Sequence, residues 1–200
     1  MVILGLTGSV GMGKTTAARH LRRLGIPVHD ADREVHRLLG PGGAAVAAVG
    51  AAFPGVLRNG AIDRAELGRR VFSDPVGLKR LESILHPLVR AAERRFLARA
   101  RRERRALVVL DIPLLFETGG EARCDLVLVV SAPRRIQLAR VMARPGMTAA
   151  RLAAIEARQM PDAEKRRLAD IVIETGMGRS HSLGQIRRAL ARIKCKKAHA

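Results

Sequence analysis

The residues with the clearest chemical potential form an octapeptide near the start of the chain, GSVGMGKT at positions 8–15, which fits the pattern G-x-x-x-x-G-K-[S/T]. Its glycines let backbone amides curl around phosphate oxygens without Cβ clashes. Lys14 supplies a compact positive charge for β- and γ-phosphates, and the hydroxyl of Thr15 is a hard oxygen ligand for Mg²⁺. An apolar run precedes the octapeptide and a helical pattern follows it, so the segment predicts a nucleoside triphosphate site. The expected nucleotide contacts are Gly8, Gly11, Met12, Gly13, Lys14, Thr15 and Thr16.

Two carboxylates, Asp30 and Asp32, follow the second apolar run of the chain. In a doubly wound sheet this position lies next to the γ-phosphate. A kinase needs a group that orients the acceptor hydroxyl and takes its proton, and a carboxylate fits that role. The alternative is a cap for the helix that begins near Arg33, which is the interpretation we favour for Asp30.

A further carboxylate, Asp111, ends the apolar run at 107–110. This is the form of a Walker B element, whose carboxylate helps to hold Mg²⁺ directly or through water. The alternative is a loop carboxylate without a metal role. Thr15 and Asp111 are therefore the candidate metal ligands.

Arginines in the second half of the chain could close over a transferring phosphoryl group, whose charge spreads over three oxygens. Arg140 and Arg144 lie one helical turn apart, on one face of a predicted helix. Any single arginine also suits a solvated surface, but a cluster on a mobile lid would exclude water and suppress ATP hydrolysis. The other members of this cluster are Arg158, Arg166 and Arg167.

The elements that must position these groups alternate between short apolar runs and helical segments. This alternation predicts an α/β fold with a parallel sheet covered on both faces. The expected strands are residues 2–6, 26–28, 107–110, 126–130 and 171–173, and the helix after the octapeptide is expected at 15–24.

One stretch, residues 40–105, breaks the alternation and shows no convincing strand. Within it, Asp63 and Glu66 could form a capping pair at a helix start. The expected helices are 42–52, 64–72 and 78–102, the last as one helix or two. We therefore predict a nucleotide-binding core at 1–39 and 106–200, with a lid at about 145–167, and an inserted helical lobe at 40–105.

The composition of the 200 residues is that of a globular chain, with 48% hydrophobic and 28% charged residues. The net charge of +19 favours anionic ligands, but aromatic residues make up only 2%, so base stacking on a nucleic acid has little support. Cys124 and Cys195 have no metal-ligand spacing, and the apolar run at the start is too short for a signal peptide or a membrane span. We expect a reduced cytosolic protein with no membrane and no specific nucleic-acid partner.

Other phosphate-loop classes fit the sequence less well. GTPases read guanine with an Asn-Lys-x-Asp element, and Asn59, the single Asn, is followed by Gly60. Motors and helicases usually need a longer chain and more strands. Small-molecule and nucleotide kinases are the class that the sequence favours.

Several segments taken in order resemble the dephospho-coenzyme A kinase family. Besides the octapeptide and the Asp-Ala-Asp at 30–32, they include His86-Pro87 in the helical lobe and PLLFE at 113–117. The resemblance continues through Gln137, Arg140 and Arg144, then Arg158-Gln159 and Ala169-Asp170, and it covers nearly the whole chain. The phosphate loop is shared by many families, whereas PLLFE, the His-Pro pair and their order are more specific.

This resemblance implies a P-loop kinase core with a five-stranded parallel sheet, a helical lobe that binds the acceptor, and a lid. It implies transfer from ATP, with Mg²⁺, to the ribose 3′-hydroxyl of dephospho-CoA, the last step of coenzyme A synthesis. By position, Asp32 would be the base, and Lys14 and Arg140 would stabilise the transferring phosphoryl. Arg144 would contact the nucleotide. The acceptor side would comprise Thr7, Asp32, His86, Leu115, Phe116 and Glu117. Without the resemblance, His86 would be read as a cap or core histidine.

The chain departs from the family pattern at a few positions. Ser9-Val10 replaces a usual Gly-Ile pair and Met12 a usual Ser or Ala; these sites mostly contribute backbone, so we expect small effects. Thr175 stands where Asn is common, which leaves the adenine contacts open. The nearest rivals are a shikimate- or gluconate-type kinase and, from another class, a nucleic-acid-binding ATPase suggested by charge alone.

Overall fold

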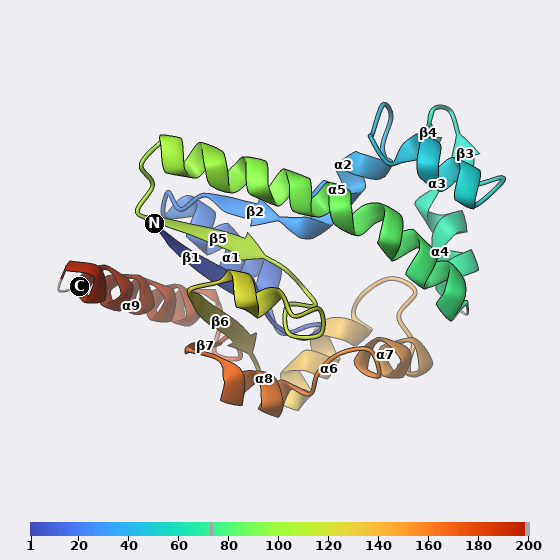
Figure 1. The fold of residues 1–200 in the computed structure, drawn as a ribbon. Coiled ribbons are helices and arrows are strands. Elements are labelled where there is room, and N and C mark those ends of the chain that lie inside the picture. Colours follow the sequence, from blue (N-terminus) through green and yellow to red (C-terminus); the bar gives the residue numbers. More distant parts are fainter. Residues whose placement is uncertain (73, 199–200) are drawn as a thin grey trace. The chain divides into compact units, whose positions relative to one another are not determined.

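The computed structural model describes residues 1–72 and 74–198, which divide into two compact units (Figure 1). Unit 1 comprises Met1–His29 and Arg104–Ala200, and unit 2 comprises Asp30–Glu103. Unit 2 thus starts before the inserted lobe predicted at 40–105 and ends close to it. The earlier start has a local cause, because strand β2 runs into helix α2 without a linker and α2 packs against α5 of the same unit.

The core of unit 1 is a five-stranded parallel sheet with the order β2-β5-β1-β6-β7. All five predicted strands are present, and the second is displaced toward its carboxyl end relative to the expected 26–28. Because the central strand β1 is buried between two neighbours, its continuous apolar run follows from the fold. The strands are β1 (Val2–Thr7), β2 (Val28–Asp30), β5 (Leu107–Asp111), β6 (Leu126–Ser131) and β7 (Ile171–Glu174).

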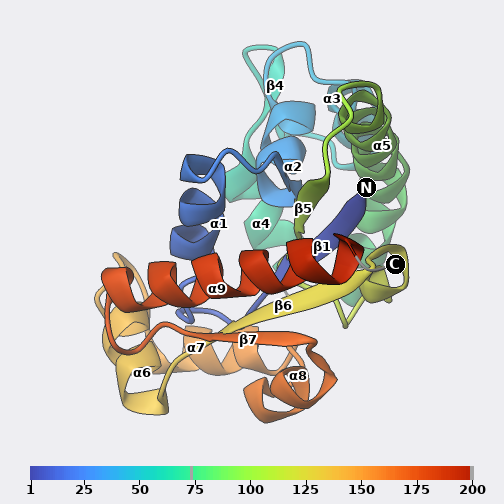
Figure 2. The same cartoon turned by 90° about the vertical axis from the view of Figure 1, so that its left-hand side faces the viewer.

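Helices α1 and α9 pack together over one face of this sheet, and Figure 2 shows α9 running along β6 and β7. Leu21 of α1 and Ile186 of α9 are fully buried against Leu4 and Leu6 of β1. Burying one such side chain contributes about 1.5–3 kcal/mol. The helices of unit 1 are α1 (Lys14–Arg23), η1 (Gly120–Arg123), α6 (Arg134–Met142), α7 (Ala149–Glu156), α8 (Asp162–Leu168) and α9 (Arg179–Ala198).

The buried histidine of α1, His20, makes the stability of unit 1 depend on pH. Its side chain is 6% exposed, and burial, with repulsion from Arg23, Arg19 and Arg179, holds its pKa below the usual value. The unfolded chain accepts a proton on this ring near pH 6.5, whereas the folded chain resists it. The contribution of the neutral His20 ring to the free energy of unfolding is therefore fully present above about pH 6.5 and is lost as the pH falls.

We expect wild-type protein to lose more stability between pH 7.5 and pH 5.5 than His20→Leu does. Urea unfolding at both pH values measures this difference. His181→Leu is the matched control, because His181 is exposed on α9. An identical loss of stability in wild type and His20→Leu would contradict the assignment.

Unit 2 is mainly helical, with one short hairpin that the sequence did not indicate. Strands β3 and β4 pair in an antiparallel arrangement around Asn59 and Gly60, both at positive φ (48° and 74°). Asn-Gly is the typical turn of a two-residue hairpin, but strands this short show no apolar alternation. The elements are α2 (Ala31–Leu39), α3 (Val46–Ala52), β3 (Leu57–Arg58), β4 (Ala61–Ile62), α4 (Arg64–Phe72) and α5 (Pro75–Arg102).

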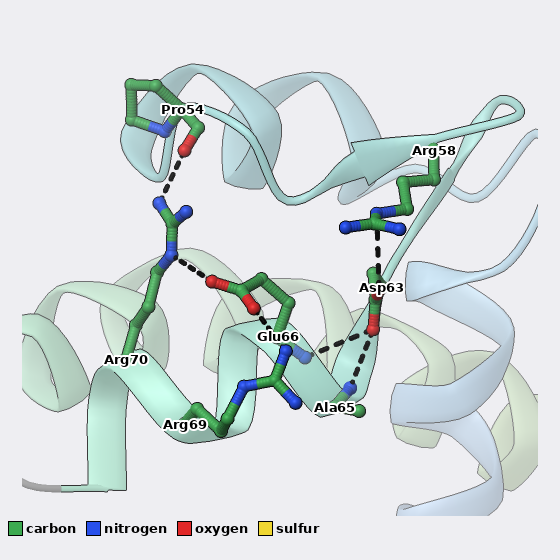
Figure 3. Close-up of polar contacts among 7 residues, drawn as sticks. All are labelled: Pro54, Arg58, Asp63, Ala65, Glu66, Arg69 and Arg70. Atoms are coloured by element: carbon green, nitrogen blue, oxygen red, sulfur yellow. Dashed lines mark hydrogen bonds and ion pairs between the residues drawn. The ribbon is translucent and has the colours of Figure 1, made fainter.

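The start of α4 confirms Asp63 as a cap but not the reciprocal half of the capping pair (Figure 3). Asp63 Oδ1 accepts hydrogen bonds of 3.0 Å from the amides of Ala65 and Glu66. The Glu66 side chain instead binds the guanidinium groups of Arg69 and Arg70, which lower its pKa to about 2. Its carboxylate therefore lies along the helix surface, because two neighbouring cations outcompete one backbone amide.

The long segment predicted as one helix or two is the single helix α5, which contains Pro87. It begins at Pro75, three residues before the expected 78, because Asp74 caps it and accepts a 3.0 Å hydrogen bond from the Val76 amide. Proline at the first helical position costs no intrahelical hydrogen bond.

Candidate active site

The phosphate loop connects β1 to α1 and depends on glycine at two positions. Gly11 and Gly13 have φ of 77° and 93°, in the left-handed region. A Cβ on Gly11 would lie 2.5 Å from the Val141 side chain, and one on Gly13 would lie 3.1 Å from Thr175 Oγ1. Gly13 also caps α1 without a side-chain hydrogen bond. The first amides of α1 thus form the kind of helix N-terminus that binds anions.

Lys14 and Asp111 meet at the carboxyl edge of the sheet. Lys14 Nζ lies 2.7 Å from Asp111 Oδ1, and the side chains are 17% and 4% exposed. The parallel register that pairs Leu6 of β1 with Asp111 of β5 brings the two elements together. Lys14, the predicted phosphate-binding lysine, is thereby held at the loop by a carboxylate that sequence spacing alone could not connect to it.

A magnesium ion fits the residue types at this edge. Thr15 is exposed at the first turn of α1, and Asp111 offers a carboxylate. Mg²⁺ is commonly held by one or two protein oxygens, with phosphates and water completing the shell. In the described ranges 1–72 and 74–198, no group of three or more His, Cys, Asp or Glu gathers as a metal cage. Thr15 and Asp111 therefore stay the predicted protein ligands of Mg²⁺.

The outer side of the loop is bonded to α6 and to the end of β7. Gln137 Nε2 donates to the Val10 carbonyl at 2.9 Å, and Thr175 Oγ1 donates to the Met12 carbonyl at 2.7 Å. Arg140 Nη1 lies 3.4 Å from the Gly11 carbonyl. Gln137 and Thr175 are functional candidates that sequence reasoning missed. The sequence signals were the place of Gln137 in a family motif and the departure of Thr175 from the usual Asn.

The guanidinium group of Arg140 is engaged in this same network. Nη1 donates to Thr175 Oγ1 at 3.0 Å, and Nη2 donates to the Thr175 carbonyl at 2.6 Å. Arg144, one turn later, is exposed. The direct phosphoryl contact of Arg140 and the nucleotide contact of Arg144 therefore stay predictions.

The side chain of Met12 does more than the sequence suggested. It is 4% exposed, packs in the core of unit 1, and its Sδ accepts a 3.2 Å hydrogen bond from the Ala132 amide. The expectation that this position contributes mainly backbone was therefore incomplete. The thioether reaches the residue that follows β6, which a Ser or Ala side chain is too short to do.

The segment of the predicted lid, at about 145–167, contains two helices, α7 and α8. Gln159, between them, accepts a 3.1 Å hydrogen bond from the Val10 amide. Arg134 Nη2 binds Glu156 at 3.0 Å, and Arg166 binds Glu174 at 3.1 Å. A cavity of about 360 Å³ lies beside the loop, lined by Ser9, Met12, Ala132, Arg134, Gln137, Glu156, Gln159, Met160, Pro161 and Asp162.

The predicted acceptor residues of unit 1 have different surroundings. The hydroxyl of Thr7 is buried and donates to the Pro113 carbonyl at 2.9 Å, and Leu115 is fully buried. Phe116 and Glu117 are half-buried. Glu117 Oε1 accepts from the Met160 amide at 2.8 Å and lies 2.8 Å from Nζ of the fully buried Lys165. A buried ion pair thus connects the segment after β5 to the predicted lid segment.

The predicted residues of unit 2 lie on two helices. Asp30 caps α2 by accepting a 3.0 Å hydrogen bond from the Arg33 amide, which confirms its structural interpretation. Asp32 is exposed in the first turn of α2, and His86 is exposed on α5 before Pro87. Asp32 is thus the more exposed residue of the pair, whereas Asp30 is half-buried.

The sheet order, the glycine-dependent loop and the Lys14–Asp111 pair define a P-loop kinase fold. Comparison with known proteins gives the family. The family model for dephospho-CoA kinase matches residues 2–179, so the chain belongs to the dephospho-CoA kinase family.

Individual relatives agree with this assignment. The chain is 71% identical over 166 residues to a dephospho-CoA kinase of Paramagnetospirillum magneticum, covering 83% of this chain and 78% of the relative. It is 60% identical over 191 residues to that of Rhodospirillum rubrum, covering 94% and 90%. The solved dephospho-CoA kinase of Campylobacter jejuni has a TM-score of 0.72 at 25% identity, covering 98% of each chain. These likenesses confirm the predicted family and fold.

Proposed function

We propose that this enzyme transfers the γ-phosphoryl group of ATP to the ribose 3′-hydroxyl of dephospho-CoA, giving coenzyme A and ADP. The observation that carries the proposal is the match of residues 2–179 to the dephospho-CoA kinase family. The phosphate loop and the Lys14–Asp111 pair support it, because they supply the nucleotide half of such a site. None of the helices among the described residues is long and apolar enough to cross a membrane.

In the proposed reaction the 3′-oxygen forms a bond to the γ-phosphorus while the bond to the β–γ bridging oxygen breaks. Asp32 accepts the hydroxyl proton. Lys14 and Arg140 offset the charge on the transferring group, and Arg144 contacts the nucleotide. Thr15 and Asp111 would hold Mg²⁺, which neutralises phosphate charge when bound. The lid at 145–167 excludes water and so limits ATP hydrolysis.

On the acceptor side we propose contacts from His86, Phe116 and Glu117. Phe116 supplies apolar area in a chain without Tyr or Trp. Thr7 and Leu115 would act on this side indirectly, because the Thr7 hydroxyl donates to the Pro113 carbonyl and Leu115 is fully buried. They would order the segment after β5 rather than present their side chains to the acceptor.

An ADP-release assay with MgATP tests the function. We expect turnover that depends on dephospho-CoA, with coenzyme A as the product, and no turnover with shikimate, gluconate, nucleoside monophosphates or polynucleotide. Turnover with another metabolite only would retain the kinase fold and overturn the substrate. ATPase activity stimulated by polynucleotide, with steeply salt-dependent binding, would favour the nucleic-acid-binding alternative.

A further inference from the structure

The phosphate loop has an outer side that is held by residues outside it. The carbonyls of Val10, Gly11 and Met12 point to groups on α6 and at the end of β7. In a trans peptide the carbonyl and the N–H of the same unit point in opposite directions. A carbonyl held on the outer side therefore directs the next N–H toward the inner side, where phosphate oxygens bind in loops of this kind. The Met12 N–H is the exception, because it donates to the Ser9 carbonyl at 3.1 Å.

Thr175 occupies the centre of this outer network. Its Oγ1 donates to the Met12 carbonyl at 2.7 Å and accepts from Arg140 Nη1 at 3.0 Å, so one hydroxyl uses its donor and an acceptor position at once. The residue is 6% exposed, and its amide donates to the Ser131 carbonyl of β6 at 2.8 Å. The Thr175 backbone is therefore held by β6, and its hydroxyl is oriented by the guanidinium group of Arg140.

We propose that Thr175 is a positioning residue for nucleotide binding, whose hydroxyl fixes the Met12–Gly13 peptide so that the Gly13 N–H faces the phosphates. The tight approach of Gly13 to Thr175 belongs to the same arrangement, since a Cβ there would meet Oγ1 at 3.1 Å. Because the hydroxyl binds the loop, the side chain is directed away from a role in reading the base. The inference rests on the proposed nucleotide site and adds a residue to it.

The variants Thr175→Val and Thr175→Ser distinguish the effect of the hydroxyl from the effect of side-chain packing. Valine keeps the shape of threonine and removes the hydrogen bond, whereas serine keeps the hydroxyl. Losing one buried donor to a carbonyl should weaken MgADP binding roughly 10-fold in Thr175→Val. Thr175→Ser should bind MgADP close to wild type. Isothermal titration with MgADP measures both without the acceptor.

Steady-state kinetics and unfolding give the second readout. In Thr175→Val the KM for ATP should rise by the same factor, while the KM for dephospho-CoA stays unchanged. Ser182→Ala is the matched control, because its hydroxyl is also buried and donates to a carbonyl, that of Arg179 at 3.0 Å, away from the loop. It should lose comparable thermal stability without a change in MgADP affinity.

Wild-type MgADP affinity in Thr175→Val would overturn the proposal, as would equal weakening in Ser182→Ala or no recovery in Thr175→Ser. These outcomes differ from failure of the proposed function. In that case wild-type protein binds MgADP but does not phosphorylate dephospho-CoA, and the Thr175 variants still report on the loop.

Discussion

Asp32→Asn is expected to lower kcat for dephospho-CoA phosphorylation by roughly 10²- to 10⁴-fold, the usual contribution of a general base. The amide keeps the size and a hydrogen-bond acceptor but cannot take the hydroxyl proton. MgATP binding should stay close to wild type, because Asp32 lies on α2 and not in the phosphate loop. Single-turnover kinetics with titrated MgATP separate the two effects.

Asp30→Asn is the matched control for this substitution. Asp30 lies two residues earlier and caps α2 through the Arg33 amide, a role that Asn fills as well as Asp does. The control should therefore retain activity and stability. Near wild-type turnover in Asp32→Asn, or an equal loss in Asp30→Asn, would remove Asp32 from the role of base.

Lys14→Ala should impair nucleotide binding and phosphoryl transfer together, with a fall in kcat/KM for ATP of about 10³-fold. The Lys14 ammonium group is the positive charge that the loop motif provides for the β- and γ-phosphates. The substitution also removes the cation 2.7 Å from a carboxylate that is 4% exposed. We expect the free energy of unfolding to fall by about 2 kcal/mol.

Two further variants separate these effects of Lys14. Lys14→Ala combined with Asp111→Asn should recover most of the stability, because the uncompensated charge is gone, but should recover no activity. Lys194→Ala removes an exposed lysine of α9 in the same unit and should change neither property. A stable and active Lys14→Ala protein would contradict both the ion pair and the phosphate contact.

Much of the fold followed from local pattern. Continuous apolar runs marked the five parallel strands, since strands buried on both faces need apolar side chains at successive positions. Asp30 and Asp63 were readable as caps because a cap needs only a short polar side chain before a helix. The sequence did not predict the hairpin of β3 and β4, because a strand of two residues is too short to show an apolar alternation.

In the site, too, some features followed from the local sequence and others only from the tertiary structure. The sequence by itself determined the phosphate loop, because glycine, lysine and threonine at fixed spacing are required by the local geometry of one turn. It did not connect Lys14 with Asp111, Glu117 with Lys165, or Thr175 with Met12. The partners in these pairs are far apart in the chain. Only the parallel order of the strands and the return of β7 beside β6 decide which side chains meet, since distance along the chain carries no record of proximity across a sheet.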